Sequence, residues 1–169
     1  MPSSREAKAR KCAESHCAAF PKIAAVTAQE FMELRGPNCV VVDVRTREER
    51  RVARIPGSIS RRAFETSLEE DDYRERDVVV YCTVGRRSGA YATALEKRHL
   101  CRSVRNSHGI VAYSHHDDAY GEGPHALVDD DDRPAERIHV YARPWNFANE
   151  RFAAVEFGFF GAIAATWRD

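Results

Sequence analysis

The segment "VVVYCTVGRRSGA", Val78 to Ala90, brings together residue types that can do covalent chemistry on an anion. Cys82 offers a sulfur nucleophile, and the two arginines that follow offer fixed positive charge. A thiolate attacks electrophilic sulfur or phosphorus far better than a thiol does, and guanidinium groups bind sulfonate, sulfate-like and phosphate groups in a forked geometry. The segment therefore indicates a cysteine nucleophile placed beside an anion site.

The residues around Cys82 predict how that nucleophile is presented. The run "DVVVYC" is apolar and β-branched, which is typical of a strand buried on both faces, and "SGAYATALEKRHL" indicates a helix that begins near Ser88. Ligands of open parallel sheets bind at the carboxyl ends of the strands. Gly85 allows the short connection to curl, so that backbone N–H groups and the helix N-terminus surround the sulfur. We expect Cys82 to be nucleophilic at neutral pH.

The local charge favours an anionic partner. Between Tyr81 and Ile110 one acidic residue, Glu96, faces six basic residues, which are Arg86, Arg87, Lys97, Arg98, Arg102 and Arg105. Arg87 lies on the loop itself and is the best candidate to bind the anion.

The segment upstream of Cys82 also alternates between predicted helices and strands, and this alternation predicts the fold class. Thr27 with Glu30 and Thr46 with Glu49 have capping-box spacing, and "CVVVDVR", residues 39–45, is a second buried strand. Strands that alternate with helices predict an α/β fold with an open parallel sheet and helices on both of its faces.

Composition limits the function classes. The 169 residues carry 26 basic and 26 acidic side chains, so net charge favours neither nucleic acid nor an anionic membrane as a partner. Five cysteines without a C-x-x-C pair favour free thiols in a reducing compartment, and no apolar run approaches the length of a transmembrane span. We expect a cytoplasmic protein, with the mitochondrion as the alternative.

The chain divides into three parts: an N-terminal extension at 1–22, a core domain at 23–117, and an acidic loop with a C-terminal extension at 118–169. "RIHVYARPW" in the last part is a candidate strand or extended arm. The apolar stripe that ends the chain predicts an amphipathic helix through Phe152, Val155, Phe159, Ile163 and Trp167. Packing on the core is the simplest role for this helix; a homodimer contact, a protein partner or a membrane surface are its alternatives.

The loop "CTVGRRS", residues 82–88, resembles the active-site loop of rhodanese-family sulfurtransferases, whose common form is C-x-x-G-x-R-S. The upstream segments "VVVDVRTREE" and "RIPGSI" resemble the D-V-R and H-I-P-G-A segments of that family, and "NSHGIVAY" resembles its later glycine turn. The resemblance runs from about Thr27 to His116 and implies the rhodanese-like fold.

The resemblance also implies a mechanism that needs no cofactor or metal. The Cys82 thiolate takes the outer sulfur of thiosulfate or of another sulfane donor, becomes a persulfide, and passes the sulfur to cyanide or a thiol. Asp43 and Arg45 match the D-V-R segment and are expected to form a mainly structural ion pair. The residues implied in binding the small anionic donor are Thr83, Val84, Gly85, Arg86, Arg87 and Ser88.

Two departures from the family pattern bear on the substrate. Arg54 stands where the family usually has a histidine, which we interpret as surface variation. The residues after Cys82 differ from the uncharged loop of mercaptopyruvate-using relatives, so thiosulfate or a protein persulfide is the expected donor.

Three other hypotheses stay open. A cell-division-cycle type phosphatase or arsenate reductase would carry H-C-x5-R, but here Tyr81 precedes Cys82 and the arginine comes five positions after it. A rhodanese-like module could instead bind partners or sense oxidation without catalysis, with Cys101 as a resolving thiol, although core packing better explains Cys101. A metal site is the weakest hypothesis, since its candidates lack regular ligand spacing; they are His108, His115, His116, Asp117, Asp118 and His125.

Overall fold

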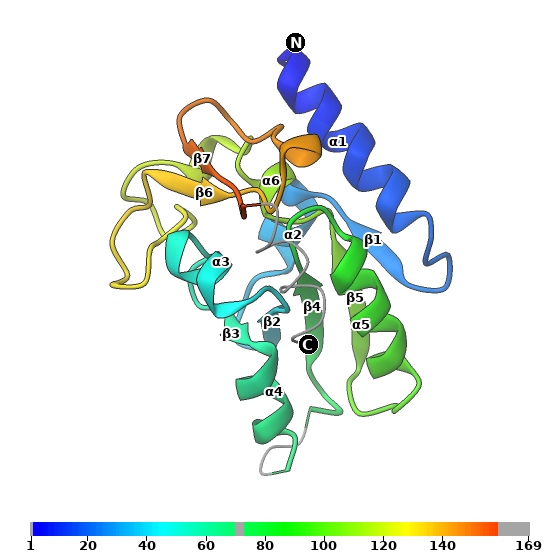
Figure 1. The fold of residues 1–169 in the computed structure, drawn as a ribbon. Helices are drawn as coiled ribbons and strands as arrows, with labels where there is room; N and C mark the ends of the chain where they lie inside the picture. The colour runs from blue at the N-terminus through cyan, green and yellow to red at the C-terminus, as the bar shows by residue number, and fades with distance from the viewer. Residues whose placement is uncertain (1, 70–72, 159–169) are drawn as a thin grey trace.

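The protein was analysed as a computed structural model, which describes residues 2–69 and 73–158. Its centre is a five-stranded parallel sheet in the order β1-β5-β4-β2-β3, with β4 in the middle (Figure 1). The strands are β1 (Ala24–Val26), β2 (Cys39–Asp43), β3 (Ile59–Ser60), β4 (Asp77–Tyr81) and β5 (Ser103–Ser107). The parallel α/β sheet expected from the sequence is confirmed.

Six α-helices are present in the described residues. They are α1 (Ser4–Cys17), α2 (Ala28–Leu34), α3 (Arg47–Val52), α4 (Arg61–Ser67), α5 (Arg86–Glu96) and α6 (Ile110–Tyr113). Thr27 and Thr46 close the predicted capping boxes of α2 and α3, each by accepting a backbone N–H three residues on. Helix α5 begins at Arg86, two residues earlier than expected, because Gly85 adopts a left-handed conformation at φ 88° and serves as its N-cap.

Alternate side chains of the central strands enter two separate cores, which is why both runs of valines are continuous. Val41, Val79 and Tyr81 belong to the core under α2 and α6. Val42, Val78 and Val80 belong to the other core, with α4 and α5. Cys82 continues this second set and is 1% exposed. The alternation of β4 therefore determines the side of the sheet on which the Cys82 side chain lies.

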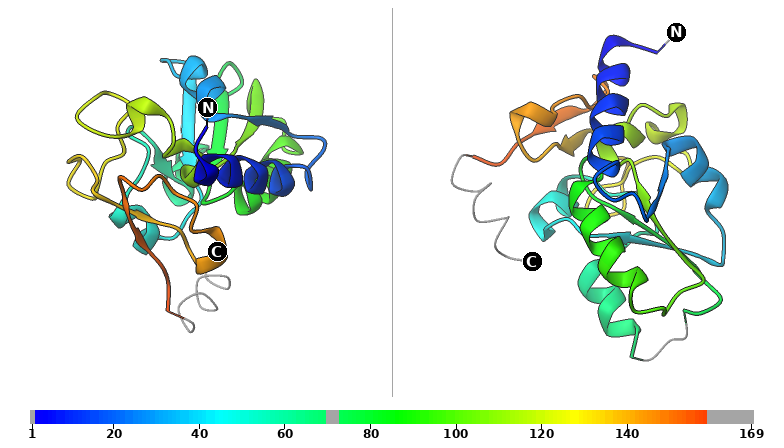
Figure 2. Two further views of the ribbon diagram at one scale, coloured as in Figure 1. Left: turned by 90° about the horizontal axis from the view of Figure 1, so that it is seen from above. Right: turned by 90° about the vertical axis from the view of Figure 1, so that its right-hand side faces the viewer.

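Two segments outside the sheet cover the edge where the strands end. Helix α1 packs against α5 and α6, and a small parallel pair, β6 (Arg137–His139) with β7 (Ala153–Val155), packs against α3 through β6 (Figures 1 and 2). The N-terminal and C-terminal segments also touch each other. The Arg5 guanidinium donates to the backbone carbonyls of Asn146 and Ala148, each over 3.0 Å. Segments from both ends of the chain thus meet above the sheet.

The C-terminal segment differs in part from expectation. Of the two alternatives for "RIHVYARPW", a strand or an extended arm, the strand is present as β6, and a short 3-10 helix follows at Arg143–Trp145. The helix predicted to include Phe152 and Val155 is wrong over that stretch, because Ala153–Val155 pair with β6 as β7. A three-residue spacing of apolar side chains does not by itself separate a helix from a strand whose partner lies elsewhere. The remainder of the predicted helix, from Phe159 onward, lies outside the described residues.

Residues 114–134 are largely irregular chain. They contain a short 3-10 helix at Asp117–Ala119 and are attached to the domain by an isolated antiparallel bridge between Arg54 and Val128. None of the helices in the described residues has both the length and the apolar character needed to cross a bilayer.

Candidate active site

Cys82 directly follows β4, the central strand, and three residues separate it from the first residue of α5. Within the described residues, no backbone N–H from Thr83 to Ser88 donates to a backbone carbonyl. Backbone donors that have no intramolecular acceptor, on a tight turn at a helix start, form the kind of nest that binds anions. The loop therefore has the backbone arrangement expected for holding a negatively charged sulfur.

The Cys82 side chain has polar neighbours on one side. Its Sγ lies 3.4 Å from Ser88 Oγ, and Ser88 Oγ lies 2.6 Å from Asn106 Oδ1. The amide nitrogen of Asn106 lies 3.3 Å from the Sγ of Cys17, the last residue of α1. Burial and the nearby Cys82 raise the pKa of Cys17 to about 12. Two thiols are thus joined through the side chains of a serine and an asparagine.

Arg87 is held by an acidic residue that the sequence analysis did not assign to the site. Its two terminal nitrogens donate to the Glu49 carboxylate over 2.8 and 2.6 Å, and Thr83 Oγ1 also donates to that carboxylate. Burial by itself would raise the pKa of Glu49, but hydrogen bonds and charge from Arg87 outweigh it and lower the pKa to about 2. The forked face of Arg87 is therefore occupied by a carboxylate in this structure.

A second, fully buried ion pair supports the loop from below. Arg45 donates from two nitrogens to the Asp43 carboxylate, and both side chains are inaccessible to solvent. Tyr81, which precedes Cys82, donates its hydroxyl to Asp43 and accepts the Ile55 N–H. The ion pair expected between Asp43 and Arg45 is present, and through Tyr81 it is connected to the end of β4.

The C-terminal segment adds aromatic residues above the loop. The ring of Tyr141 lies 4.9 Å from the Arg87 guanidinium, and Trp145 lies 5.3 Å from Tyr141. His139 on β6 is buried, and burial is the main cause that lowers its pKa to about 4; the charge of Glu49 opposes this shift, and the charges of Arg45 and Arg87 add to it. A segment outside the core domain thus covers the Arg87 side of the site.

Arg86 lies in a different environment from Arg87. It is exposed, it has no ion-pair partner within residues 2–69 and 73–158, and its guanidinium lies 5.8 Å from the Phe20 ring. Of the two arginines that begin α5, Arg86 is the more exposed to solvent.

Gly109 explains how the later glycine turn packs on the active-site loop. A Cβ atom at this position would lie 2.5 Å from the Thr83 carbonyl oxygen, and the backbone has φ 90° and ψ 170°, a conformation used almost only by glycine. The following N–H groups, of Ile110 and Val111, donate to the carbonyls of Cys82 and Thr83. The turn therefore sets the height of the loop above the sheet.

The comparison with protein families agrees with this geometry, since residues 27–116 match the family described as Rhodanese-like domain. The chain belongs to the rhodanese-like domain family. The match includes the Cys82 loop, Glu49, Asn106 and the Gly109 turn, and it leaves out α1 and the whole C-terminal segment. The rhodanese-like domain is therefore extended at both ends by segments that reach the candidate site, Cys17 close to Gly85 and Tyr141 over Arg87.

Several solved structures resemble the chain at low identity. A rhodanese-like domain protein from Staphylococcus aureus is 23% identical, with 54% of this chain and 91% of that chain covered and a TM-score of 0.46. A thiosulfate sulfurtransferase from Pseudomonas aeruginosa is 20% identical, with 64% and 21% covered and a TM-score of 0.45. A protein from Rhodopseudomonas palustris described as a possible tyrosine phosphatase is 24% identical, with 67% and 93% covered and a TM-score of 0.44. None of these likenesses says what this chain does, and no curated protein matches it.

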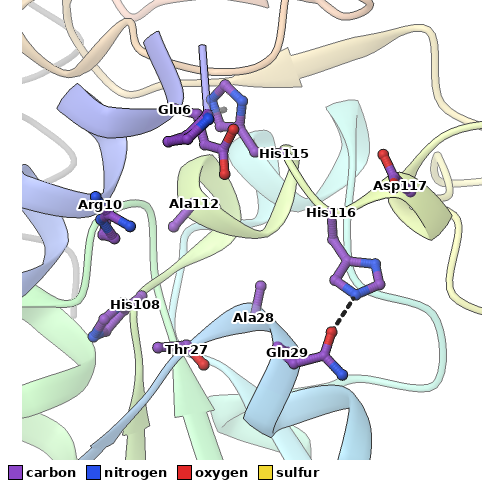
Figure 3. A pocket seen from close by; sticks show the side chains of 11 residues that line it. Glu6, Arg10, Thr27, Ala28, Gln29, His108, Ala112, His115, His116 and Asp117 are labelled. Carbon is purple, nitrogen blue, oxygen red and sulfur yellow. Dashed lines mark hydrogen bonds between the residues drawn. The ribbon is translucent and has the colours of Figure 1, made fainter. Parts of the chain in front are cut away.

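A separate cavity of about 640 Å³ lies between α1, the start of α2 and α6 (Figure 3). Three of the histidines considered as metal ligands line it, His108, His115 and His116, together with Arg10, Glu6 and Asp117. Figure 3 shows His116 turned toward Gln29, to which its Nε2 is hydrogen bonded over 3.0 Å. In the described part of the chain, no three His, Cys, Asp or Glu side chains converge as metal ligands would.

Sequence reasoning missed the residues that come from distant segments: Glu49, Asn106, Cys17, His139 and Tyr141. The sequence predicted Glu49 only as a capping residue. The structure shows this role too, since Glu49 Oε2 accepts the Thr46 N–H. Cys101, the thiol considered for redox chemistry, lies beyond the far end of α5 and packs against the core that contains Val78, Val80 and Cys82, as its position in the sequence suggested.

Proposed function

We propose that this protein is a sulfurtransferase that carries a sulfane sulfur on Cys82. The observation that carries the proposal is an intact cysteine at the end of the central strand of a rhodanese-like domain, followed by a three-residue turn and an arginine-bearing helix. Cysteine, turn and cation together meet the needs of nucleophilic attack on an anionic sulfur donor.

The first half-reaction forms the persulfide. The Cys82 thiolate attacks the outer sulfur of thiosulfate, the sulfur–sulfur bond of thiosulfate breaks, and sulfite leaves with the bonding electron pair. Backbone N–H groups from Thr83 onward, which have no backbone acceptor in the described structure, are placed to bind the negative charge of the thiolate and of the persulfide.

The second half-reaction releases the sulfur. Cyanide or a thiolate attacks the outer sulfur of the persulfide, the bond between the two sulfurs breaks, and the Cys82 thiolate is restored. Splitting the transfer into two displacements gives ping-pong kinetics.

The two loop arginines have different parts in this proposal. Arg87 is bound by Glu49 and covered by Tyr141, so it holds the loop and contributes positive potential near Cys82. Arg86 is exposed and supplies the charge that the donor meets first. Because Cys82 is 1% exposed, a slim donor such as thiosulfate, or the terminal sulfurs of a persulfide, suits the site better than a bulky one.

Intact-protein mass spectrometry tests the proposal. Treatment with thiosulfate should add about 32 Da, the mass of one sulfur, and cyanide should remove it. Cys82→Ser should gain nothing, whereas Cys101→Ser, which alters a thiol at the far end of α5, should behave like the unaltered protein. If neither thiosulfate nor glutathione persulfide adds mass to Cys82, the proposal is wrong and a binding or redox-sensing module becomes the better hypothesis.

A further inference from the structure

Asn106 is a buried side chain whose amide orientation is fixed by its neighbours. It lies on β5 and is 1% exposed. Its Nδ2 donates to the Gly85 carbonyl over 2.9 Å and lies 3.3 Å from Cys17 Sγ. A carbonyl oxygen accepts hydrogen bonds and cannot donate, so the amide nitrogen must face Gly85. The amide oxygen of Asn106 must then face the other way.

On that other side lies Ser88, which is fully buried. Ser88 Oγ is 2.6 Å from Asn106 Oδ1, and an amide oxygen has no hydrogen to give. The Ser88 hydroxyl is therefore the donor in this contact. A serine has one hydroxyl hydrogen, and here that hydrogen is directed to Asn106.

The same Ser88 oxygen lies 3.4 Å from the sulfur of Cys82. Ser88 can donate to that sulfur or to Asn106, but its single hydrogen serves only one acceptor at a time, and the Asn106 oxygen is the nearer. While the hydrogen is directed to Asn106, Ser88 presents only lone pairs to the sulfur. Lone pairs accept the S–H of a thiol, whereas they offer nothing to a thiolate. The contact between Ser88 and Cys82 thus favours the protonated sulfur for as long as Asn106 holds the hydroxyl hydrogen.

We propose that Asn106 is a positioning residue that competes with the Cys82 thiolate for the hydroxyl hydrogen of Ser88 and so sets how much thiolate the resting site contains. Its catalytic meaning rests on the proposed sulfurtransferase function, which it deepens. When Ser88 turns its hydrogen to the sulfur, the thiolate gains a donor and Asn106 loses one. No proton leaves the site in this exchange, because only the direction of one O–H bond changes.

The test is Asn106→Leu, which removes the competing oxygen with little change in size. The Gly85 carbonyl keeps its bond from the Gly89 N–H at 3.2 Å, so the substitution leaves that carbonyl satisfied. Among the described residues, interactions with Cys82 are found for two ionisable groups, Cys17 from α1 and Arg87 from α5, and Glu49 from α3 acts through Arg87. All three side chains are retained in the variant.

The measurement is the rate of alkylation of Cys82 by iodoacetamide as a function of pH, with the modified peptide quantified by mass spectrometry. One hydrogen bond to a charged group raises the thiolate fraction about tenfold, and the lower intrinsic nucleophilicity of a stabilised thiolate leaves a net gain of about threefold at pH 7. The midpoint of the pH dependence should move to lower pH. Asn106→Ala also removes the amide oxygen and should move the midpoint in the same direction. It is measured alongside so that a packing defect caused by the leucine does not decide the result.

A double-mutant cycle separates positioning from a general loosening of the site. In a Ser88→Ala background, Asn106→Leu should leave the pH dependence unchanged, because the proposed effect acts only through the Ser88 hydroxyl. Cys17→Ala is the matched control, since Cys17 contacts the nitrogen side of the same amide. Burial and the nearby Cys82 raise the pKa of Cys17 to about 12, so its thiol is uncharged near pH 7 and its removal should cause no shift. An unchanged midpoint in both Asn106 variants, or a shift that persists without Ser88, overturns the proposal.

The readout also separates this inference from the proposed function. Alkylation needs no sulfur donor, so the shift can be present in a protein that forms no persulfide. Conversely, persulfide formation without any shift in the Asn106 variants would support the sulfurtransferase and reject the role of Asn106.

Discussion

Glu49 and Arg87 connect the first turn of α3 to the first turn of α5: the Glu49 carboxylate accepts hydrogen bonds from both terminal nitrogens of Arg87. Glu49 is fully buried and Arg87 is 25% exposed. The pair therefore ties the start of α5, directly after the Cys82 loop, to a helix residue that lies 38 positions earlier in the chain.

Replacement of Glu49 by glutamine should destabilise the protein, because the amide keeps the size of the side chain but leaves the Arg87 charge without its partner. We expect a loss of about 2 kcal/mol in the free energy of unfolding, less than for a fully buried pair because Arg87 is partly exposed. Glu65→Gln breaks the more exposed pair with Arg61 and should cost under about 0.5 kcal/mol. Urea unfolding of both variants measures the difference, and equal losses would contradict the prediction.

The same ion pair predicts a dependence of stability on pH. The pKa of Glu49 is lowered to about 2 in the folded protein, against about 4.3 in an unfolded chain. The stabilisation is therefore complete above the unfolded value and is lost as the pH falls from about 4.3 toward 2. The difference in unfolding free energy between the unaltered protein and Glu49→Gln should shrink across that window. A constant difference from pH 5 to pH 2 would show that charge has no part in it.

Gly109→Ala should displace the loop that follows Cys82. An added Cβ would overlap the Thr83 carbonyl, and the positive φ adds backbone strain. Gly121 also has a positive φ, of 101°, but a Cβ there meets nothing within 4 Å. Strain alone should cost Gly121→Ala about 1 kcal/mol, and the overlap should bring Gly109→Ala to about 3 kcal/mol with a loss of sulfur transfer. Thermal unfolding and thiosulfate turnover of the two variants test this difference.

Arg86→Gln should weaken donor binding without altering the chemical step. We expect the KM for thiosulfate to rise about fivefold, the effect of one charge-assisted contact at an exposed site, with kcat nearly unchanged. Arg98→Gln, beyond the other end of α5, removes the same charge far from Cys82 and should change neither constant. A fall in kcat with an unchanged KM for Arg86→Gln would mean that Arg86 acts in the transition state instead.

Tyr141→Leu should expose the Arg87 side of the site. Loss of the aromatic ring over the guanidinium should lower the free energy of unfolding by about 1 kcal/mol. Tyr141→Phe keeps the ring and should retain most of this stabilisation. Guanidinium chloride weakens ionic contacts by screening, so urea is the denaturant of choice for this comparison. Equal stability of the Leu and Phe variants would rule out a contribution from the ring.

The sequence predicted what is local along the chain. Cys82, its turn and α5 are contiguous, so strand propensity, Gly85 and the helix pattern were enough to place Cys82 at the edge of a parallel sheet. The capping boxes at Thr27 and Thr46 could also be predicted from the sequence, because each involves residues only three positions apart.

What the sequence could not predict depends on which distant segments meet. Glu49 reaches Arg87, and Cys17 reaches Asn106, only after the sheet has folded. The start of the C-terminal segment was misassigned for the same reason, since the pairing of β7 with β6 is a long-range choice that a local apolar period does not contain. Arg87 is the clearest example. Its charge and its position after Cys82 predicted that it binds an anionic substrate, but in the structure its guanidinium binds the Glu49 carboxylate of the same chain.

The contact between Arg5 and the backbone at Asn146 and Ala148 makes the two ends of the chain depend on each other. Helix α1 brings Cys17 to the loop from one side, and the C-terminal segment brings Tyr141 from the other. Residues 27–116, transferred alone into another protein, would therefore keep Cys82 but lose Cys17 and Tyr141, two side chains that reach the site from outside the matched domain.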